Sequence, residues 1–224
     1  MSQIKTIKTE NLLSADSPYI KSLFDSTEYA WEIIPKIKEH IKSLLASGVD
    51  GFSEIAPGIL VGKRVKIAST AVIEPPAVIG EGTEIRPGAY LRGNVIVGER
   101  CVIGNSTEIK NAVISDRAAI PHYNYVGDSV LGYHAHLGAG AVCSNLRLDG
   151  KSVRLFLDRE YDTGLRKFGA VLGDNTDVGC NCVLNPGTVI GRGSAVYPLT
   201  SLRGVYPGNS IIKDTKSFIF KEDK

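Results

Sequence analysis

The sequence predicts a mainly β protein built as a parallel β-helix, a coil of short strands in which each turn stacks on the previous one. Three observations predict this fold. From Val61 an aliphatic residue returns at every sixth position, in the series Ile67, Ile73, Ile79, Ile85, Leu91, Val97, Ile103 and Ile109. Glycine often follows directly, as in Ile79-Gly80 and Val97-Gly98. The chain also has 24 glycines, one tryptophan and six phenylalanines, which suits stacked aliphatic side chains joined by tight corners.

Other regular structures fit the period poorly. Six residues of an α-helix advance by about 600°, so a helix cannot keep every sixth residue on one face. Strands average about five or six residues and do not run for fifty. An antiparallel β-sandwich with unusual spacing is the remaining alternative.

The inward series defines the extent of the coil. After Ile109 it continues with two five-residue steps through Ile114, Ile120, Val126, Leu131, Leu137 and Cys143. It resumes with Leu172, Val178, Leu184, Ile190, Val196 and Leu202. We therefore predict a coil over residues 51–206, interrupted by a charged insertion at about 144–170 that has no six-residue period.

The flanking segments have a different character. Residues 1–50 are predicted to be helical, because Asp16-Ser17-Pro18 is typical of a helix start and Gly48 of a helix end. Between them an apolar stripe at helical spacing consists of Ile34, Ile37, Ile41, Leu44 and Leu45. We expect these helices to cap the open end of the coil, with binding of a partner as the alternative. In the tail, 207–224, the stretch Ser217-Phe218-Ile219-Phe220 is expected to add a strand or to contact a neighbouring subunit.

Composition excludes several classes of protein. The 26 Lys and Arg nearly balance 24 Asp and Glu, which disfavours a nucleic-acid-binding protein. No apolar run reaches the length of a membrane span, and the first residues lack the apolar stretch of a signal peptide. The spacing of the cysteines does not suggest a disulfide framework, so we expect reduced thiols in a cytoplasmic protein. These cysteines are Cys101, Cys143, Cys180 and Cys182.

Two cations are predicted to stack on one face of the coil. Arg92 and Lys110 each follow an inward residue and are separated by three six-residue steps. They should lie about 4.8 Å apart along the axis, which is the spacing of paired strands. An arginine fork beside a lysine point charge forms a suitable phosphate site. The alternative is a pair of solvated surface side chains.

A histidine lies two faces further along the coil. His122 follows Ile120, so we expect it to meet Arg92 and Lys110 only where two subunits pack together. A cyclic homotrimer would form three such clefts. A purely structural role remains open for His122, and a packing role for Tyr125.

From about Ile85 to Leu202 the chain resembles the acetyltransferase domain of the bacterial bifunctional glucosamine-1-phosphate acetyltransferase/N-acetylglucosamine-1-phosphate uridylyltransferase. It is more similar still to stand-alone, left-handed β-helical proteins called UDP-N-acetylglucosamine-pyrophosphorylase-related. The matching strings are I-R-P-G-A-Y-L-R (85–92), E-I-K-N (108–111), H-Y-N-Y-V-G-D (122–128), L-G-A-G-A-V-C-S-N (137–145) and R-K-F-G-A-V-L-G-D (166–174).

The resemblance implies acetyl transfer from acetyl-CoA to the amine of an amino-sugar 1-phosphate. Arg92 and Lys110 match the phosphate-binding pair, and His122 matches the catalytic base, a task that suits an imidazole near neutral pH. Tyr125 matches a sugar-contacting tyrosine, and Asn145 an asparagine beside the reacting groups.

The resemblance also implies the remaining contacts. Ala139 lies on the path of acetyl-CoA. Lys167 matches a substrate-binding lysine when counted back from Leu172, whereas Lys151 matches when counted forward from Asn145. No metal is required for this acetyl transfer.

The chain departs from the family pattern at several positions. His136 replaces a sugar-contacting asparagine, Cys180 a serine on the coenzyme path, and Pro198 a small residue there. The insertion at 144–170 is longer than its counterpart in the bifunctional enzyme. The nucleotidyltransferase half has no counterpart before the coil, so uridylyl transfer is not expected.

Two other functions remain open. The γ-type carbonic anhydrases use the same coil, and His122, His134 and His136 could supply zinc ligands. A trimeric protein could instead bind a nucleotide-sugar or sugar phosphate without acetylating it, although such a binder would need no base at His122.

Overall fold

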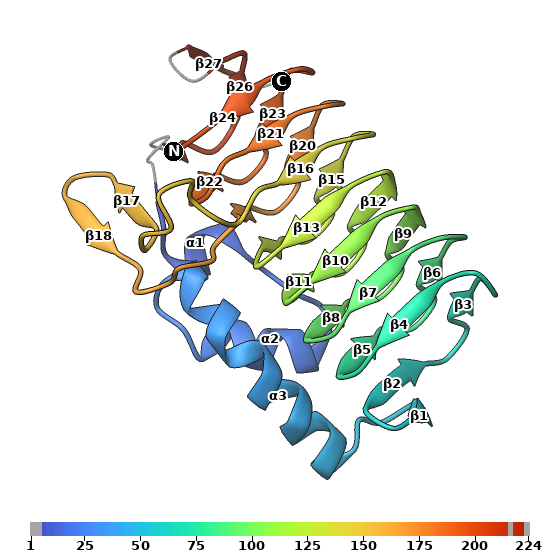
Figure 1. Ribbon diagram of the computed structural model, residues 1–224. Coiled ribbons are helices and arrows are strands. Elements are labelled where there is room, and N and C mark those ends of the chain that lie inside the picture. Colours follow the sequence, from blue (N-terminus) through green and yellow to red (C-terminus); the bar gives the residue numbers. More distant parts are fainter. Residues whose placement is uncertain (1–5, 215–216, 222–224) are drawn as a thin grey trace.

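The computed structural model describes residues 6–214 and 217–221 and shows a coil of three parallel sheets with helices along one side (Figure 1). Successive strands of the coil enter the three sheets in a fixed order, so neighbouring strands of one sheet are one turn apart. We number the sheets I, II and III in the order in which the chain first enters them. The expected left-handed parallel β-helix is confirmed.

The strands are short and in register from turn to turn. Sheet I contains β1 (Phe52–Ala56), β2 (Ile59–Gly62), β5 (Ala77–Ile79), β8 (Val95–Val97), β11 (Ala112–Ile114), β14 (Val130–Leu131), β19 (Ala170–Leu172), β22 (Thr188–Ile190) and β25 (Val205–Tyr206). Sheet II contains β3 (Lys66–Ile67), β6 (Glu84–Ile85), β9 (Val102–Asn105), β12 (Ala119–His122), β15 (His136–Leu137), β20 (Asp177–Val178), β23 (Ala195–Val196), β26 (Ser210–Ile212) and β27 (Phe218–Phe220). Sheet III contains β4 (Val72–Glu74), β7 (Tyr90–Arg92), β10 (Glu108–Lys110), β13 (Tyr125–Gly127), β16 (Val142–Cys143), β21 (Val183–Leu184) and β24 (Ser201–Leu202).

The aliphatic residues of the six-residue period fill the interior of the coil. One cluster of buried residues runs from Val61 through Leu202 to Ile212. It contains the predicted inward residues except Ile67, which is 38% exposed, and Ile73, which is only partly buried. The five-residue steps arise at the corners between sheets III and I. One corner uses two residues with positive φ, Gly93 and Asn94, whereas one turn later Asn111 alone makes the bend. The shorter corner removes one residue from the turn and leaves the core register intact.

The outer side of sheet I is apolar and covered. One residue of each parallel strand of sheet I, from β2 to β25, points away from the core, yet none of these is more than 6% exposed. They are Leu60, Val78, Ile96, Val113, Val130, Val171, Val189 and Val205. Together with the buried residues of the helices they form a second hydrophobic cluster, separate from the core of the coil.

The N-terminal helices supply the other half of this second cluster. They are α1 (Thr9–Leu12), α2 (Pro18–Asp25), the 3-10 helix η1 (Ala30–Glu32) and α3 (Ile33–Ser47). The predicted stripe on α3 buries Ile34, Ile37 and Ile41, and the helix ends at Gly48, whose φ is 74°. The expected end cap is wrong, because α3 contacts β8 and β11 and the helices run beside sheet I (Figure 1). The apolar outer row of sheet I provides the physical reason.

Two carboxylates of the coil hold the start of the helical segment. The Asp116 carboxylate accepts hydrogen bonds from the backbone N–H of Asp16 (2.7 Å) and Ser17 (2.9 Å) and from the Ser17 hydroxyl. Asp174 accepts from the backbone N–H and hydroxyl of Ser14, at 3.0 and 2.7 Å. Both carboxylates are at least 95% buried, so the segment is attached to the coil by polar contacts as well as by apolar packing.

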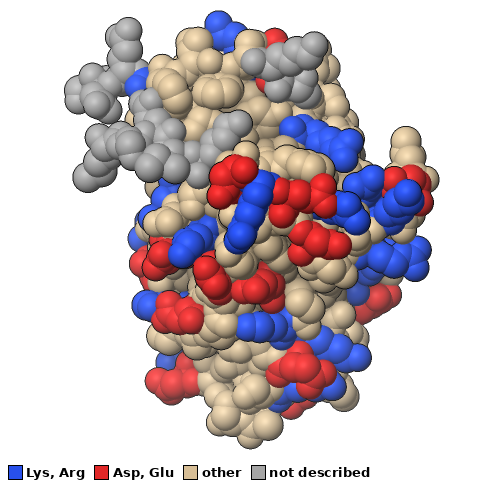
Figure 2. Space-filling model, turned by 90° about the vertical axis from the view of Figure 1, so that its left-hand side faces the viewer, with Lys and Arg blue, Asp and Glu red and all other residues tan. Residues whose placement is uncertain are grey.

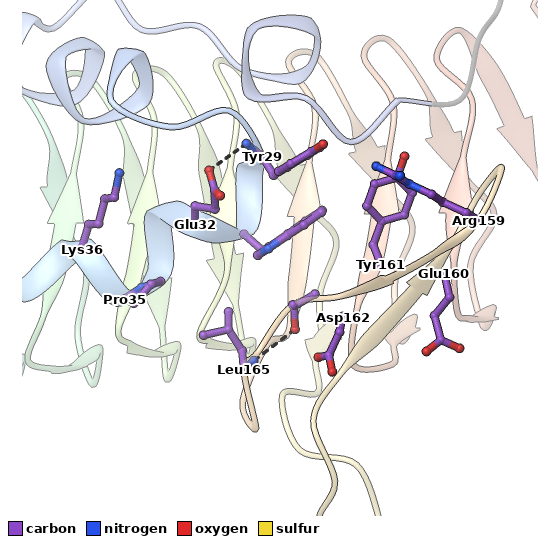
Figure 3. Close-up of a pocket in the computed structure, with 11 residues that line it drawn as sticks. Tyr29, Glu32, Pro35, Lys36, Arg159, Glu160, Tyr161, Asp162 and Leu165 are labelled. Carbon is purple, nitrogen blue, oxygen red and sulfur yellow. Dashed lines mark hydrogen bonds between the residues drawn. The ribbon is translucent and has the colours of Figure 1, made fainter.

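The insertion at 144–170 forms an antiparallel hairpin of β17 (Arg154–Phe156) and β18 (Glu160–Asp162). Tyr161 meets Tyr29 and Trp31 edge-on, at ring-centroid distances of 5.8 and 6.3 Å. Tyr29 and Trp31 are themselves stacked at 4.7 Å. We call these three rings the aromatic joint. It borders a hollow of about 670 Å³ and connects the hairpin to the helical layer (Figure 3).

The C-terminal boundary of the coil differs from the prediction. The coil continues beyond residue 206, because β26 pairs in parallel with β23. The expected extra strand is β27, which pairs antiparallel with β26. Residues 1–5, 215–216 and 222–224 of the predicted cap and tail lie outside the described residues.

Candidate functional site

Arg92 and Lys110 lie at equivalent positions on adjacent strands of sheet III. Leu91 is in register with Ile109, so the two cations occupy the next rung. The Arg92 guanidinium donates a 2.6 Å hydrogen bond to the Glu108 carboxylate, and it lies 5.8 Å from the Tyr90 ring. The sequence predicts two stacked cations, and the structure adds that Glu108 neutralises Arg92. Among the described residues, Lys110 forms no ion pair.

Asn145 is held in one orientation at the corner between sheets III and I, which we call edge III–I. Its Nδ2 donates to Asp128 Oδ2 and, at 3.3 Å, to the Tyr125 hydroxyl. The other oxygen of Asp128 accepts a 2.8 Å bond from Nδ2 of Asn111. Because the amide nitrogen is engaged, the Oδ1 of Asn145 remains as an acceptor, suited to a substrate N–H group.

Asp128 and Asn111 belong to this network although the sequence analysis did not select them. Asp128 is 5% exposed and is bonded to two amides, which is the usual requirement for a buried carboxylate. Burial also raises the pKa of the neighbouring Tyr125 phenol, which favours its neutral, hydrogen-bonding form.

Lys167 lies beside this network, whereas Lys151 does not adjoin it. Lys167 forms an isolated antiparallel bridge with Leu146, the residue after Asn145, and the next residue, Phe168, donates its N–H to the Asn145 carbonyl at 2.9 Å. Lys151 lies further out on the insertion, where its N–H donates to Asp149. The geometry therefore favours Lys167 of the two alternatives that the spacing left open.

The corner between sheets II and III, which we call edge II–III, brings four predicted residues into one column. Backbone hydrogen bonds connect successive turns: the carbonyls of His122, Ala139 and Cys180 accept from the residues one turn later. Pro198 continues the column, because Leu199 donates to the Cys180 carbonyl at 2.9 Å. The predicted base and the predicted coenzyme-path residues thus share one edge of the coil.

A buried asparagine side chain holds the corner at His122. The buried Asn124 accepts the His122 N–H at 3.1 Å and donates to the Gly138 carbonyl at 2.8 Å. Tyr123 takes the left-handed conformation with φ of 51°. The His122 side chain is exposed and forms no hydrogen bond with the described residues. An exposed imidazole on a rigid turn is free to contact a ligand.

Within one chain His122 and the cations lie at opposite margins of sheet III. Gly127 pairs in register with Lys110 and comes five residues after His122. At about 3.3 Å per residue the two backbones are on the order of 15 Å apart. His122 thus borders the face that carries the cations, although its strand belongs to sheet II.

His136 lies away from both edges. It points outward from sheet II, and its Nδ1 is 2.8 Å from Asp177 Oδ1 on the next strand. The structure therefore does not bring His136 together with Asn145 or Lys110. In the described part of the chain, no three His, Cys, Asp or Glu side chains form a group arranged for a metal ion.

Charge on the surface is mixed. Figure 2 shows acidic and basic side chains interspersed over the face that carries the helices and the hairpin. The four cysteines are unpaired, and burial raises the pKa of Cys101 and Cys143 to about 12. In residues 6–214 and 217–221 no helix has the length and apolar character needed to cross a membrane.

Comparisons with known proteins identify relatives of the chain. Residues 73–159 match the family model described as the GMPPB C-terminal domain. The chain is 32% identical over 194 residues to the bifunctional protein GlmU of Methanococcus aeolicus, covering 79% of this chain and 46% of that protein. It is 37% identical over 151 residues to a bifunctional sugar-1-phosphate nucleotidylyltransferase/acetyltransferase of Sulfurisphaera tokodaii, covering 62% and 38%. The chain thus spans less than half the length of these relatives.

Solved structures give weaker matches. A perosamine N-acetyltransferase from Caulobacter crescentus, in complex with CoA and GDP-perosamine, has 18% identity and a TM-score of 0.42, covering 71% of this chain and 57% of that one. The N-acyltransferase AntD from Bacillus cereus, in complex with dTDP and coenzyme A, has 16% identity and a TM-score of 0.43, covering 79% and 93%.

Proposed function

The chain is a member of the left-handed, hexapeptide-repeat β-helix family and is related in sequence to the bifunctional GlmU proteins; on this basis we propose that it is an acetyl-CoA-dependent N-acetyltransferase. Its acceptor is the amine of an amino-sugar 1-phosphate or a related sugar phosphate. The observation that carries the proposal is the position of the predicted groups at the two opposite edges of sheet III. His122 and the coenzyme-path residues occupy one edge, and the oriented Asn145 occupies the other.

The chemistry follows from these side chains. The amine nitrogen attacks the carbonyl carbon of the thioester while the His122 imidazole accepts a proton from that nitrogen. The carbon–sulfur bond then breaks, and coenzyme A leaves as a thiolate that takes a proton from the imidazolium. Asn145 Oδ1 holds an amine N–H group and so directs the nitrogen lone pair. Lys110 and Lys167 hold the phosphate of the acceptor.

A homotrimer completes the site in this proposal. The edge containing His122 is on the order of 15 Å from Lys110 within one chain, which is too far for one small acceptor to contact both directly. Packing of edge II–III of one subunit against sheet III of another would close this gap three times in a cyclic trimer. Unpaired cysteines, among them the exposed Cys180, support a reducing cytoplasmic location.

The test uses purified full-length protein with acetyl-CoA and glucosamine 1-phosphate, with release of free thiol as the readout. We expect turnover that falls by about 10²- to 10⁴-fold in His122→Ala, the usual contribution of a general base. His134→Ala is the matched control, because it removes another exposed histidine from a corner with φ of 54° and should leave turnover unchanged. Light scattering in the same buffer reports the trimer.

The outcomes separate the alternatives. Turnover retained by His122→Ala would reject its role as the base. Tight binding of sugar phosphate without turnover would instead favour the non-catalytic binding protein, for which the engagement of His136 by Asp177 is the supporting observation.

A further inference from the structure

A second hollow opens at edge III–I, next to the oriented Asn145. It has a volume of about 500 Å³, and we call it the edge hollow. Its polar side consists of Asn111, Asp128, Arg166 and Lys167. Its apolar side includes Ile34, Pro35 and Leu165. Residues from the coil, from α3 and from the insertion thus meet at one place. A single phosphate group would fill only a small part of this volume.

The cations around the edge hollow lack carboxylate partners. Lys110, which precedes the lining residue Asn111, and Lys167 form no ion pair among the described residues. Arg166 donates only from Nε, to the Gly150 carbonyl at 3.3 Å, and its terminal nitrogens remain available. This contrasts with Arg92, which Glu108 neutralises. Unpaired cations close to an uncharged apolar wall are typical of a site for an anion with an attached ring.

We propose that the edge hollow binds the nucleoside diphosphate part of the acceptor, so that the acceptor is a nucleotide-linked amino sugar. This rests on the proposed function and specifies its substrate class. The diphosphate lies against Lys110, Lys167 and Arg166. The base packs against the apolar side of the hollow, and the sugar amine extends to Asn145 at edge III–I.

The position of the edge hollow indicates that the nucleotide bound there belongs to the acceptor and not to the coenzyme. The predicted coenzyme path, with Ala139, Cys180 and Pro198, follows edge II–III on the other margin of sheet III. A nucleotide at edge III–I is therefore adjacent to the group that orients the amine, and the coenzyme approaches from the opposite side. The two nucleotide-containing substrates would then occupy different edges of the coil and would not compete.

The larger hollow at the aromatic joint is a poorer ligand site. Arg159 covers the Tyr161 ring at 4.8 Å, and Tyr161 presents its edges to the stacked Tyr29 and Trp31 (Figure 3). Trp31 is only 6% exposed. Since these rings already contact one another, they offer little free surface for stacking, and their function is to hold the hairpin on the helices.

The test measures binding without turnover. UDP, GDP, dTDP and inorganic phosphate are titrated into the full-length protein by calorimetry. We expect at least one nucleoside diphosphate to bind ten times more tightly than phosphate, or better, and saturating coenzyme A to leave that affinity unchanged. Arg166→Ala should weaken the nucleotide by roughly tenfold, the effect of one charge-assisted contact. Leu165→Ala, which removes apolar surface without adding charge, should also weaken nucleotide binding and leave phosphate binding nearly unchanged.

Arg159→Ala is the matched control, because it removes an exposed arginine of the same insertion outside the edge hollow and should leave nucleotide affinity unchanged. Affinities equal to that of phosphate, or displacement of the nucleotide by coenzyme A, would overturn the inference. Acetylation of glucosamine 1-phosphate would still support the proposed function in that case. Conversely, the protein could bind a nucleotide in a manner sensitive to Arg166→Ala and yet transfer no acetyl group. That result would support the nucleotide site and contradict the proposed acetyltransferase activity.

Discussion

Sheets I and III are made from the same repeat, but the residues on their outer sides differ. In sheet I the outward residue is an aliphatic such as Val113 or Ile96, and the N-terminal helices cover it. In sheet III the outward positions carry Tyr90, Arg92, Glu108 and similar residues, and the described chain leaves them accessible. The inward series is equivalent in both sheets, so the outward residues decide which side is closed by packing and which can bind a ligand.

The largest effect is expected when a charged side chain is placed on the outer side of sheet I, under the helices. Val113 is fully buried beneath α3, so Val113→Asp introduces a carboxylate with neither water nor a partner. We expect a loss of about 4 kcal/mol or more in the free energy of unfolding, measured by urea titration. The same substitution at Val183, an outward residue of sheet III that is 37% exposed, should change it by less than about 0.5 kcal/mol. Similar losses at both positions would contradict the proposed difference.

A smaller loss is expected when the polar attachment of the helices is removed. Asp116→Ala leaves the N–H groups of Asp16 and Ser17 without their acceptor and should cost about 3 kcal/mol. Trp31, the single tryptophan, lies in the helical layer and reports its release by fluorescence, while circular dichroism reports the coil. The exposed Asp177→Ala is the control. A fluorescence transition that stays unchanged in Asp116→Ala would show that apolar packing alone holds the layer.

On the polar side, Asp128→Asn should affect activity more than stability. An amide has one acceptor oxygen in place of two, so it cannot hold Asn111 and Asn145 in their present orientations. We expect kcat to fall by about 10- to 100-fold while KM for acetyl-CoA stays the same, as befits a positioning residue. Asp149→Asn on the insertion is the control. Equal changes in kcat and in the KM for acetyl-CoA would indicate general disruption.

The smallest effect is expected at Glu108. Replacing it with Gln removes the carboxylate that competes for the Arg92 guanidinium, so a phosphate ligand should bind about two- to fivefold more tightly. Glu84→Gln, which removes an equivalent partner of Arg86 on sheet II, should leave phosphate affinity unchanged. Weaker phosphate binding in Glu108→Gln would mean that the carboxylate itself positions the ligand.

The sequence predicts the core of the coil well because the inward residue recurs at a nearly constant spacing. This spacing does not depend on what covers the outer side of the strand. Each predicted residue from Ile79 to Leu202 lies in the buried cluster. The covered side of sheet I was missed, although its signal is present. Triplets such as Val95-Ile96-Val97 are apolar at the outward position too, which indicates burial on both sides.

The candidate site shows where sequence patterns stop being informative. Asn94, Asn111, Asp128 and Asn145 recur every seventeen residues, so the polar column at edge III–I could have been found from the shortened turns. The pairing of Arg92 with Glu108 could not, because it depends on how two flexible side chains turn toward each other. The same holds for the edge hollow, which needs residues from α3 and the insertion to meet beside the coil.

The attachment of Ser14 to Asp174 joins residues 160 positions apart, and this has a consequence for synthesis on the ribosome. The helices emerge first, but their second anchor does not exist until most of the coil has been translated. At about 5–20 residues per second, the helical segment waits on the order of ten seconds or more before its second polar anchor can form. The growing solenoid therefore has to assemble beside a segment that can complete its docking only late.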